Sequence, residues 1–355
     1  MADLLGLSAR IIDSGVADEP VNRTTQELSE VADGIAVVES FSHSVAVRTD
    51  EGLVVFDASG AQTGAQVVEA LRGWSTEPVH TLVYTHGHVD HVGGSGALLA
   101  DGAERGHRRP RVAAHENVGR RLDRYRRTSG YNLVINARQF GWLRDPAMRI
   151  GAGELSPPVG ARTPRFLPDD VAEPDVTYSD RLDLQVGGLD IALHHAKGET
   201  DDHTWAWLPP HRAICAGDFL IWNFPNAGNP QKVQRYPDQW ATALRAMAAQ
   251  DAELFLPAHG LPIAGRDRIR RVLTEVADVL DDLVDRTLAL MNEGATLDTV
   301  LHTVAVPDAA LARPYLRPLY DEPEFVVRNI SRLYGGWYDG NPARLKPPGG
   351  APRPA

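Results

Sequence analysis

Residues 81–94 read TLVYTHGHVDHVGG and place four potential metal ligands directly behind a short apolar run. These ligands are His86, His88, Asp90 and His91. Residues two apart in an extended or turning segment project from the same side, so His86 and His88 can present their imidazole nitrogens to one cation. Asp90 and His91 lie just beyond, where the turn aims them at a second cation. The HxHxDH spacing therefore predicts a metal site at the C-terminal end of a strand.

Composition and charge exclude some classes of partner. The chain has 355 residues, of which 43% are hydrophobic, and its formal net charge is -11. This length permits one large domain or two modest ones. An acidic chain is poorly suited to nucleic acid or to an anionic membrane as its main partner, so any anionic substrate must be held by local charge. No run of about eighteen apolar residues occurs, so no membrane span is predicted.

The cysteine content and the first residues bear on the compartment. Cys215 is the single cysteine, so no intrachain disulfide is possible, which fits a reducing environment. The first twenty residues lack the basic start and the long apolar run of a secretory signal. We therefore expect a cytoplasmic protein.

The pattern of apolar residues divides the chain into a strand-rich part and a helical part. Short β-rich runs begin at residue 34, and a helical pattern at residues 62–74 precedes the metal motif. Further apolar runs lie within residues 182–219 and 253–257. From residue 265 onward the pattern becomes that of long amphipathic helices. This order predicts an α+β protein.

Two segments show no such periodicity. Residues 1 to about 30 are expected to be irregular and to wrap the surface of the domain. Residues 151–174 form a proline-rich loop, and a loop of this length is more often a functional flap than a simple connection. We expect it to control substrate access.

Three later runs each end in another potential ligand. These are Glu199 in HHAKGETDDHT, Asp218 in CAGDF and His259 in LPAHG. Asp218 is suited to bridge two cations about 3.5–4 Å apart, since one carboxylate offers two oxygens. The alternative interpretation is that the two carboxylates are ordinary turn residues and that His259 is a loop histidine.

Other polar residues have less certain roles. One of His194, His195 and His203 is expected to orient a ligand by donating a hydrogen bond to it. An arginine-rich helix follows residue 116, and its basic side chains either form a solvated face or include one or two that hold an anion. The candidates for the second role are Arg120, Arg121, Arg124 and Arg138.

The motifs THGHVDH, GET, GD and AHG, in this order, resemble the metallo-β-lactamase superfamily of dinuclear metal hydrolases. Most members have a third histidine where this chain has Glu199. That replacement and the run LYGGWYDGNPARLKP are similar to the alkylsulfatase branch, whose members are zinc-dependent. The resemblance implies a four-layer αββα sandwich at residues 1–264. A helical dimerisation region at residues 265–345 and a disordered tail at 346–355 would follow.

The resemblance also implies a ligand set and a homodimer. Two Zn²⁺ ions per chain are expected, the first bound by His86, His88 and Glu199 and the second by Asp90, His91 and His259, with Asp218 as the bridge. Two departures concern the substrate. Larger alkylsulfatases carry a further domain after the GWYDGNP run, where this chain stops. The branch also has an Arg-Gly pair for the sulfate group, where this chain reads AGNPQKVQRYP.

The predicted reaction is hydrolysis of a sulfate ester by a metal-activated hydroxide, with Asp90 and Asp218 as the catalytic carboxylates. The anionic head group would be held by Asn226, Lys232 and Arg235, and a proton would come from Tyr131 or Tyr236. One alternative keeps the fold but cleaves a lactone, a carboxylic ester or a phosphoester. Lesser alternatives are a diiron oxidoreductase and a dimeric binding protein without catalytic activity.

Overall fold

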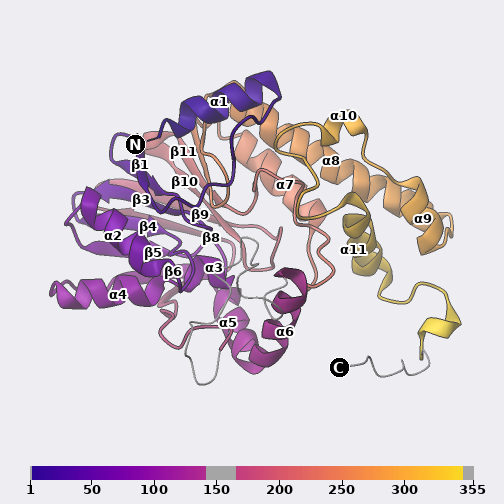
Figure 1. Cartoon of the computed structure of the whole chain (residues 1–355), viewed down its shortest axis with the longest axis horizontal. Coiled ribbons are helices and arrows are strands. Elements are labelled where there is room, and N and C mark those ends of the chain that lie inside the picture. The colour runs from indigo at the N-terminus through magenta and orange to yellow at the C-terminus, as the bar shows by residue number, and fades with distance from the viewer. Residues whose placement is uncertain (1, 141–164, 347–355) are drawn as a thin grey trace.

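The computed structural model describes residues 2–140 and 165–346 of the chain. Most of the expected access loop at 151–174, and all but the first residue of the expected tail at 346–355, lie outside the described residues. Two β-sheets pack face to face, with helices on the outer side of each (Figure 1). This arrangement confirms the predicted fold class.

The first sheet follows the chain in simple order. Its first four strands pair as antiparallel neighbours, and the later ones continue the sheet in parallel. Within the described residues this sheet has seven strands, namely β1 (Leu28–Ala32), β2 (Ile35–Val38), β3 (Ser44–Thr49), β4 (Gly52–Phe56), β5 (Val79–Val83), β6 (Arg111–His115) and β7 (Val176–Tyr178). The helices that accompany it are α2 (Gly64–Trp74), α3 (Val89–Val92), α4 (Ser95–Glu104), α5 (Asn117–Arg127) and α6 (Ser129–Phe140).

The second sheet is mostly antiparallel and has one parallel pair, between β11 and β12. Across the sheet, the described strands are ordered β13 (Ile263–Ala264), β12 (Leu254–Pro257), β11 (Ala213–Gly217), β10 (Thr204–Leu208), β9 (Leu189–His195) and β8 (Arg181–Val186). A short 3₁₀ turn, η3 (Pro209–His211), joins β10 to β11. The outer face of the second sheet is covered by α1 (Leu4–Ser14), α7 (Pro237–Ala248) and α8 (Arg266–Asn292).

The strands β2, β4, β11 and β12 are buried on both faces, which explains why they read as continuous apolar runs. In β4, Leu53 and Val55 pack in the core that the first sheet shares with its outer helices. Val54 and Phe56 point the other way, into the core between the two sheets. Alternate residues of a strand face opposite sides, so one strand supplies two cores.

The prediction for the first thirty residues was wrong at α1. Leu4, Leu7 and Ile11 lie on one face of this helix and are buried against the outer layer of the second sheet. Asp3 accepts a hydrogen bond from the Gly6 amide at the N-terminus, and Gly15 ends the helix with a φ of 72°. A stripe at this spacing with a cap at each end is a helix signal, although it spans only three turns.

The C-terminal helices are α9 (Leu297–Thr303), α10 (Asp308–Leu311) and α11 (Pro323–Gly335), followed by the 3₁₀ turn η4 (Pro342–Arg344). Val326, Val327 and Ile330 of α11 share the core formed by α7, α8 and the second sheet. Figure 1 shows α11 beside the α7–α8 pair, close to the loops at one edge of the sandwich. The helical region is therefore packed onto the sandwich.

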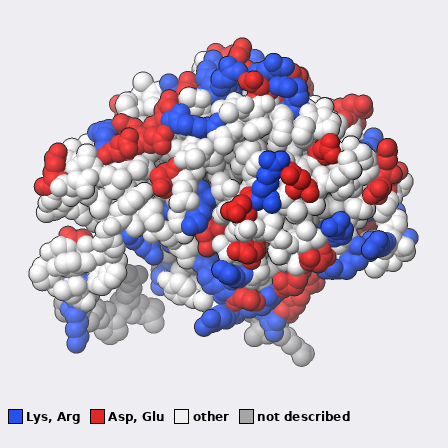
Figure 2. Space-filling view, turned by 180° about the vertical axis from the view of Figure 1, so that it is seen from behind, with Lys and Arg blue, Asp and Glu red and all other residues white. Residues whose placement is uncertain are grey.

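The surface agrees with the acidic composition. On the face shown in Figure 2, Lys and Arg side chains are interspersed with Asp and Glu and do not form one basic surface. Arg245, for example, pairs with Asp278 and Asp281. Among the described helices, none combines the length and the apolar character needed to cross a membrane.

Candidate metal centre

The potential ligands meet because four strands end at the same edge of the sandwich. β9 and β11 both pair antiparallel with β10 and so run in the same direction, and β12 is parallel to β11. Their C-terminal ends are followed by Glu199, Asp218 and His259, respectively. β5 of the first sheet ends just before His86, and the short helix α3 carries Asp90 and His91.

The structure brings the seven predicted ligands into two adjoining groups. Within each group, the possible ligand atoms all lie within 4.8 Å of one another. The first group contains His86, His88, Glu199 and Asp218, and the second contains Asp90, His91 and His259. These are the sets that the sequence predicts, with Asp218 beside both.

Asp218 lies between the two groups and offers one oxygen to each side. Its Oδ2 is 3.8 Å from His86 Nε2, and its Oδ1 is 3.3 Å from His91 Nε2 and 3.5 Å from His259 Nε2. Gly217, just before it, has a φ of 54°, and a Cβ there would lie 2.7 Å from His203 Nε2. Glycine is therefore needed at position 217 for the backbone to place Asp218 between the two groups.

A buried carboxylate that the sequence analysis missed sets the tautomers of two histidines. Asp57 follows β4 and accepts hydrogen bonds from the Thr85 amide and the Thr85 hydroxyl, both at 2.7 Å. His91 Nδ1 lies 2.8 Å from Asp57 Oδ2, so this nitrogen carries the proton. Thr85 uses its hydroxyl proton toward Asp57 and therefore accepts from His86 Nδ1, 3.1 Å away. Both histidines thus turn Nε2, the nitrogen that would bind a cation, toward the centre.

Of the three histidines considered for an orienting role, His203 contacts a potential ligand residue, but it accepts the hydrogen bond where a donor was predicted. The backbone amide of Asp218 donates to His203 Nε2 at 3.1 Å, and the His203 ring stacks on Phe219. Burial lowers the pKa of His203 to about 3, so the ring is neutral and able to accept. His194 instead stacks on Trp205, and His195 on His115.

Glu199 is held by two of the residues that were predicted to bind substrate. The side-chain amide of Asn226 donates to Glu199 Oε1. Arg235 Nη1 lies 2.9 Å from the same oxygen and also donates to the Glu199 backbone carbonyl. Arg235 is 1% exposed, so its guanidinium is paired with Glu199 and is not available to a substrate. The prediction that Arg235 holds a head group was wrong, because a buried guanidinium beside a buried carboxylate pairs with it.

The donor set fits two divalent cations. His91 Nε2, Glu199 Oε2 and Asp218 Oδ1 are buried without a hydrogen-bond partner among the described residues. Histidine nitrogens and carboxylate oxygens are the ligands that Zn²⁺ takes in such centres. Burial alone would lower the pKa of His259, but the carboxylates of Asp218 and Asp90 outweigh it and raise that pKa to about 10. The centre therefore attracts positive charge.

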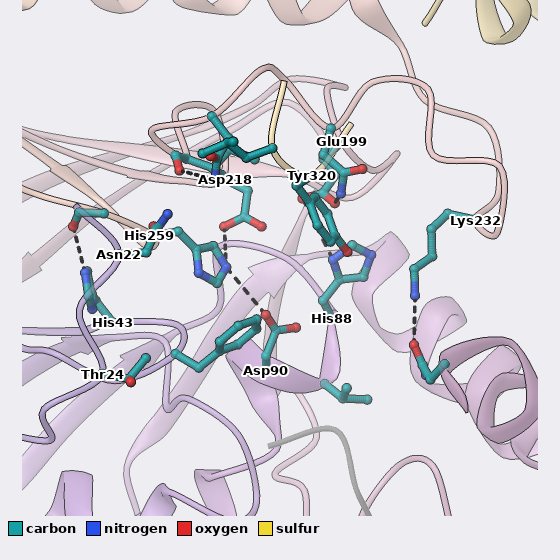
Figure 3. Close-up of a pocket in the computed structure, with 18 of the residues that line it drawn as sticks. Asn22, Thr24, His43, His88, Asp90, Glu199, Asp218, Lys232, His259 and Tyr320 are labelled. Atoms are coloured by element: carbon teal, nitrogen blue, oxygen red, sulfur yellow. Dashed lines mark hydrogen bonds and ion pairs between the residues drawn. The ribbon is translucent and has the colours of Figure 1, made fainter. Parts of the chain in front are cut away.

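The centre opens into a cavity of about 360 Å³. Figure 3 shows His259, Asp90 and Asp218 together on one side, and His88, Glu199 and Tyr320 together on another. Lys232 lies further along, and its Nζ is 3.1 Å from Asn136 Oδ1. Burial and the nearby Arg235 lower the pKa of Lys232 to about 8. The apolar part of the lining comes from Phe41, Val89, Tyr125, Phe166, Ile221 and Leu319.

The two predicted proton donors lie elsewhere. The described residues that line the cavity include neither Tyr131, which is 63% exposed on α6, nor Tyr236, whose side chain lines a separate surface hollow. Tyr320 does line the cavity and was missed. It comes from the connection before α11, far along the chain from the motifs, where local spacing carries no signal.

The arginine-rich helix α5 has one buried arginine, Arg121, but this side chain binds protein carboxylates. Arg121 is 5% exposed, and its Nε lies 2.7 Å from Asp202 Oδ2. The same oxygen accepts the Gly87 amide at 3.1 Å. Arg121 therefore braces the metal-binding turn, while Arg120 is exposed as the solvated-face interpretation predicted.

Comparison with known proteins identifies the family. Residues 37–259, more than half of the chain, match the metallo-beta-lactamase superfamily. The chain belongs to that superfamily. Residues 296–351 of this metallo-beta-lactamase chain match the alkyl sulfatase dimerisation family, so the predicted branch resemblance is confirmed.

Curated relatives from the same branch cover most of this metallo-beta-lactamase chain. It is 28% identical over 309 residues to a linear primary-alkylsulfatase of a Pseudomonas species, covering 85% of this chain and 57% of that protein. It is 24% identical over 339 residues to the alkyl/aryl-sulfatase BDS1 of Saccharomyces cerevisiae, covering 90% of this chain and 50% of that one. The chain thus spans about half the length of the curated relatives it matches.

A solved structure agrees on the fold. The stereoselective inverting sec-alkylsulfatase Pisa1 from a Pseudomonas species superposes with a TM-score of 0.73 at 22% identity. The match covers 90% of this chain and 52% of that one.

Proposed function

We propose that this chain is a dinuclear zinc hydrolase that cleaves sulfate esters of small organic alcohols. The observation that carries the proposal is the position of Asp218 between two ligand groups, with one oxygen toward each. The names of the curated relatives support a sulfate ester as the substrate. The proposed ligands are those predicted from the sequence, listed by group as His86, His88 and Glu199, then Asp90, His91 and His259, with Asp218 shared.

The cations, Lys232 and the apolar lining of the cavity would each have a different role in the reaction. Two bound divalent cations supply a water whose pKa is lowered from about 15.7 toward about 7, together with a Lewis acid for the ester oxygen. Lys232 is a partly buried cation that lines the cavity, and it would bind the sulfate group as a point charge. The apolar lining would hold the organic group and keep bulk water away.

Tyr320 is our candidate for contact with the leaving-group oxygen. Its ring lies beside Glu199 and His88 (Figure 3), and Gln139 Nε2 donates to its hydroxyl oxygen at 2.8 Å. Burial raises the pKa of Tyr320 above its ordinary value, so the phenol keeps its proton at neutral pH. It replaces Tyr131 and Tyr236 in this role.

We also propose a homodimer formed by the helical region, with residues 265–345 as the dimerisation domain and residues 1–264 as the catalytic domain. Large apolar side chains near the C-terminal end of the described chain remain exposed, among them Trp337 at 71% and Leu345 at 55%. Exposed aromatic residues in one segment are typical of a surface that a partner covers.

A second candidate function is cleavage of a lactone or a carboxylic ester. It is favoured by the pairing of Arg235 with Glu199, which leaves fewer cationic groups to bind a sulfate group than the sequence predicts. A diiron oxidoreductase remains the lesser alternative, since carboxylate-rich sites also bind iron.

Metal analysis and a substrate panel test the proposal. Protein purified without chelators should contain two zinc ions per chain and should release sulfate from short alkyl sulfates. Lys232→Met should reduce kcat/KM for alkyl sulfates by about 100-fold and change nitrophenyl acetate hydrolysis little, because only the first substrate is anionic. Faster turnover of lactones or neutral esters than of every sulfate ester would favour the second candidate. Two irons per chain with oxygen-dependent turnover would favour the lesser one.

A further inference from the structure

The helical C-terminal region reaches the metal centre through the loops that hold Glu199. Asn226, Arg235 and Tyr236 hold this ligand and the residue before it. Asn226 and Arg235 bind its Oε1, and the Tyr236 amide donates to the Gly198 carbonyl at 3.0 Å. Glu199 is therefore held from one side by residues 226–236, a stretch without a regular strand or helix before α7.

The first link from the C-terminal region to this stretch is Asp321. This side chain is 0% exposed, and its Oδ2 accepts the Gly228 amide at 2.6 Å. Its Oδ1 accepts the amide of Glu322 at 3.1 Å. A Cβ on Gly228 would lie 2.1 Å from the Phe325 carbonyl carbon, so the loop packs directly on the start of α11. Asp321 thus ties the loop that carries Asn226.

The second link is Asn329, in the middle of α11. Its Nδ2 donates to the Arg235 carbonyl at 3.0 Å. Its Oδ1 accepts Gln234 Nε2 at 2.9 Å, and Gln234 also donates to the Asn329 backbone carbonyl at 3.2 Å. Asn329 is 8% exposed, so these bonds are shielded from water. This link ties the loop that carries Arg235.

We infer that Asp321 and Asn329 are positioning residues for Glu199, acting through Asn226 and Arg235, respectively. The helical region would then do more than mediate association, because it completes one of the two cation positions. Leu319 and Tyr320 precede Asp321 and line the cavity, so the same attachment also sets one wall of the substrate site.

The inference predicts an asymmetric effect. Glu199 belongs to the group with His86 and His88, whereas His91 of the second group is held by Asp57. Loss of either link should weaken the first cation position and leave the second almost unchanged. A purely structural role of α11 would instead lower both affinities together with the stability of the whole chain.

The inference rests on the dinuclear site of the proposed function, but metal binding tests it without any assay of turnover. Zinc would be titrated into metal-free full-length protein in competition with a chromophoric chelator, giving one dissociation constant per position. Glu199→Gln and His259→Ala identify which constant belongs to which position. Asp321→Asn and Asn329→Ala are the test variants. Glu322→Gln and Arg328→Ala are matched controls, because these neighbours are exposed.

We expect Asp321→Asn and Asn329→Ala each to lower the zinc affinity of the position that contains Glu199 about tenfold. This is at the lower end of the loss seen when a residue that hydrogen-bonds a metal ligand is removed. The zinc affinity of the other position, and both affinities in the two control variants, should change less than twofold. If the link acts through Asn226, the variant that combines Asp321→Asn with Asn226→Ala should lose no more zinc affinity than Asn226→Ala alone.

Three results would overturn the inference: unchanged zinc affinities, equal loss at both positions, or additive effects in the combined variant. Thermal unfolding of the metal-free variants is measured in parallel. A variant that has lost its folded state is replaced by Asn329→Gln or Asp321→Glu, and failure of these to shift the Glu199 position selectively counts against the inference. If the unmodified chain binds fewer than two zinc ions, the proposed function fails instead.

Discussion

Asp218 turns Oδ1 toward His91 Nε2, at 3.3 Å, and keeps Oδ2 for the opposite side of the centre. One carboxylate therefore faces both cation positions. The backbone amide of Asp218 is in turn held by His203. Because burial of an unpaired carboxylate is costly, this arrangement is stable when positive charge is present on both sides.

Asp218→Ala should abolish binding at both positions and reduce hydrolysis at least about 1,000-fold, because the two cations lose their common ligand. Elemental analysis of the purified variant and a sulfate-release assay measure the two effects. Asp183→Asn, an exposed carboxylate on β8, is the control. Full zinc content with normal turnover in Asp218→Ala would remove this residue from the mechanism.

Asp57→Asn should weaken metal binding about 10–100-fold while the chain stays folded. An amide has one acceptor oxygen, so it cannot accept from the Thr85 amide on one side and from the Thr85 hydroxyl and His91 Nδ1 on the other, and the His91 tautomer is no longer set. Asp57 has a φ of 59°, a conformation that asparagine also tolerates, so the backbone should be preserved. Zinc titration measures the affinity, and circular dichroism checks the fold. An unchanged affinity would contradict the assigned hydrogen bonds.

Turnover of an anionic substrate should fall as the pH rises through about 8. Burial lowers the pKa of Lys232 to about 8, so its ammonium is present below this pH and lost above it. The kcat/KM profile for an alkyl sulfate should follow that loss, since kcat/KM reports groups of the free enzyme. Lys232→Arg should extend the plateau to higher pH, because a guanidinium stays charged. If kcat/KM of Lys232→Arg declines over the same pH range, the decline must come from the titration of another group.

Zinc binding should release protons at pH 7. Without metal, the carboxylates of Asp218 and Asp90 raise the pKa of His259 to about 10, and those of Asp218, Asp57 and Asp90 raise that of His91 despite burial. Both rings are then protonated at neutral pH and must lose a proton to coordinate a cation. Calorimetry in buffers of different ionisation enthalpy measures the number released. His259→Ala should release fewer protons, and equal release in both proteins would contradict these pKa shifts.

Trp337→Ala should weaken the proposed dimer about 30-fold, which corresponds to about 2 kcal/mol for an aromatic interface residue. Light scattering across a dilution series measures the change. Val16→Ala is the control, since Val16 is also exposed, at 61%, but follows α1. A monomeric unmodified chain at every concentration would reject the dimer itself.

Most of the fold could be predicted from local pattern. Strands such as β4 and β11 are buried on both sides, so their runs LVVF and AICAG stand out without any knowledge of their partners. α1 was missed because a helix of 11 residues with a polar outer face resembles a surface segment until its packing on the second sheet is known. Its spacing and caps were nevertheless visible.

The sequence by itself determined the potential metal ligands, because His86, His88, Asp90 and His91 are adjacent in the chain and the other three each close an apolar run. Only the tertiary structure decided the roles of the charged and aromatic residues around them. Arg235 looks like an anion-binding residue until its burial beside Glu199 is seen, and Tyr320 enters the cavity from a distant helical region. Ligand spacing is a local property, whereas the partner of a buried charge depends on which segments the fold brings together.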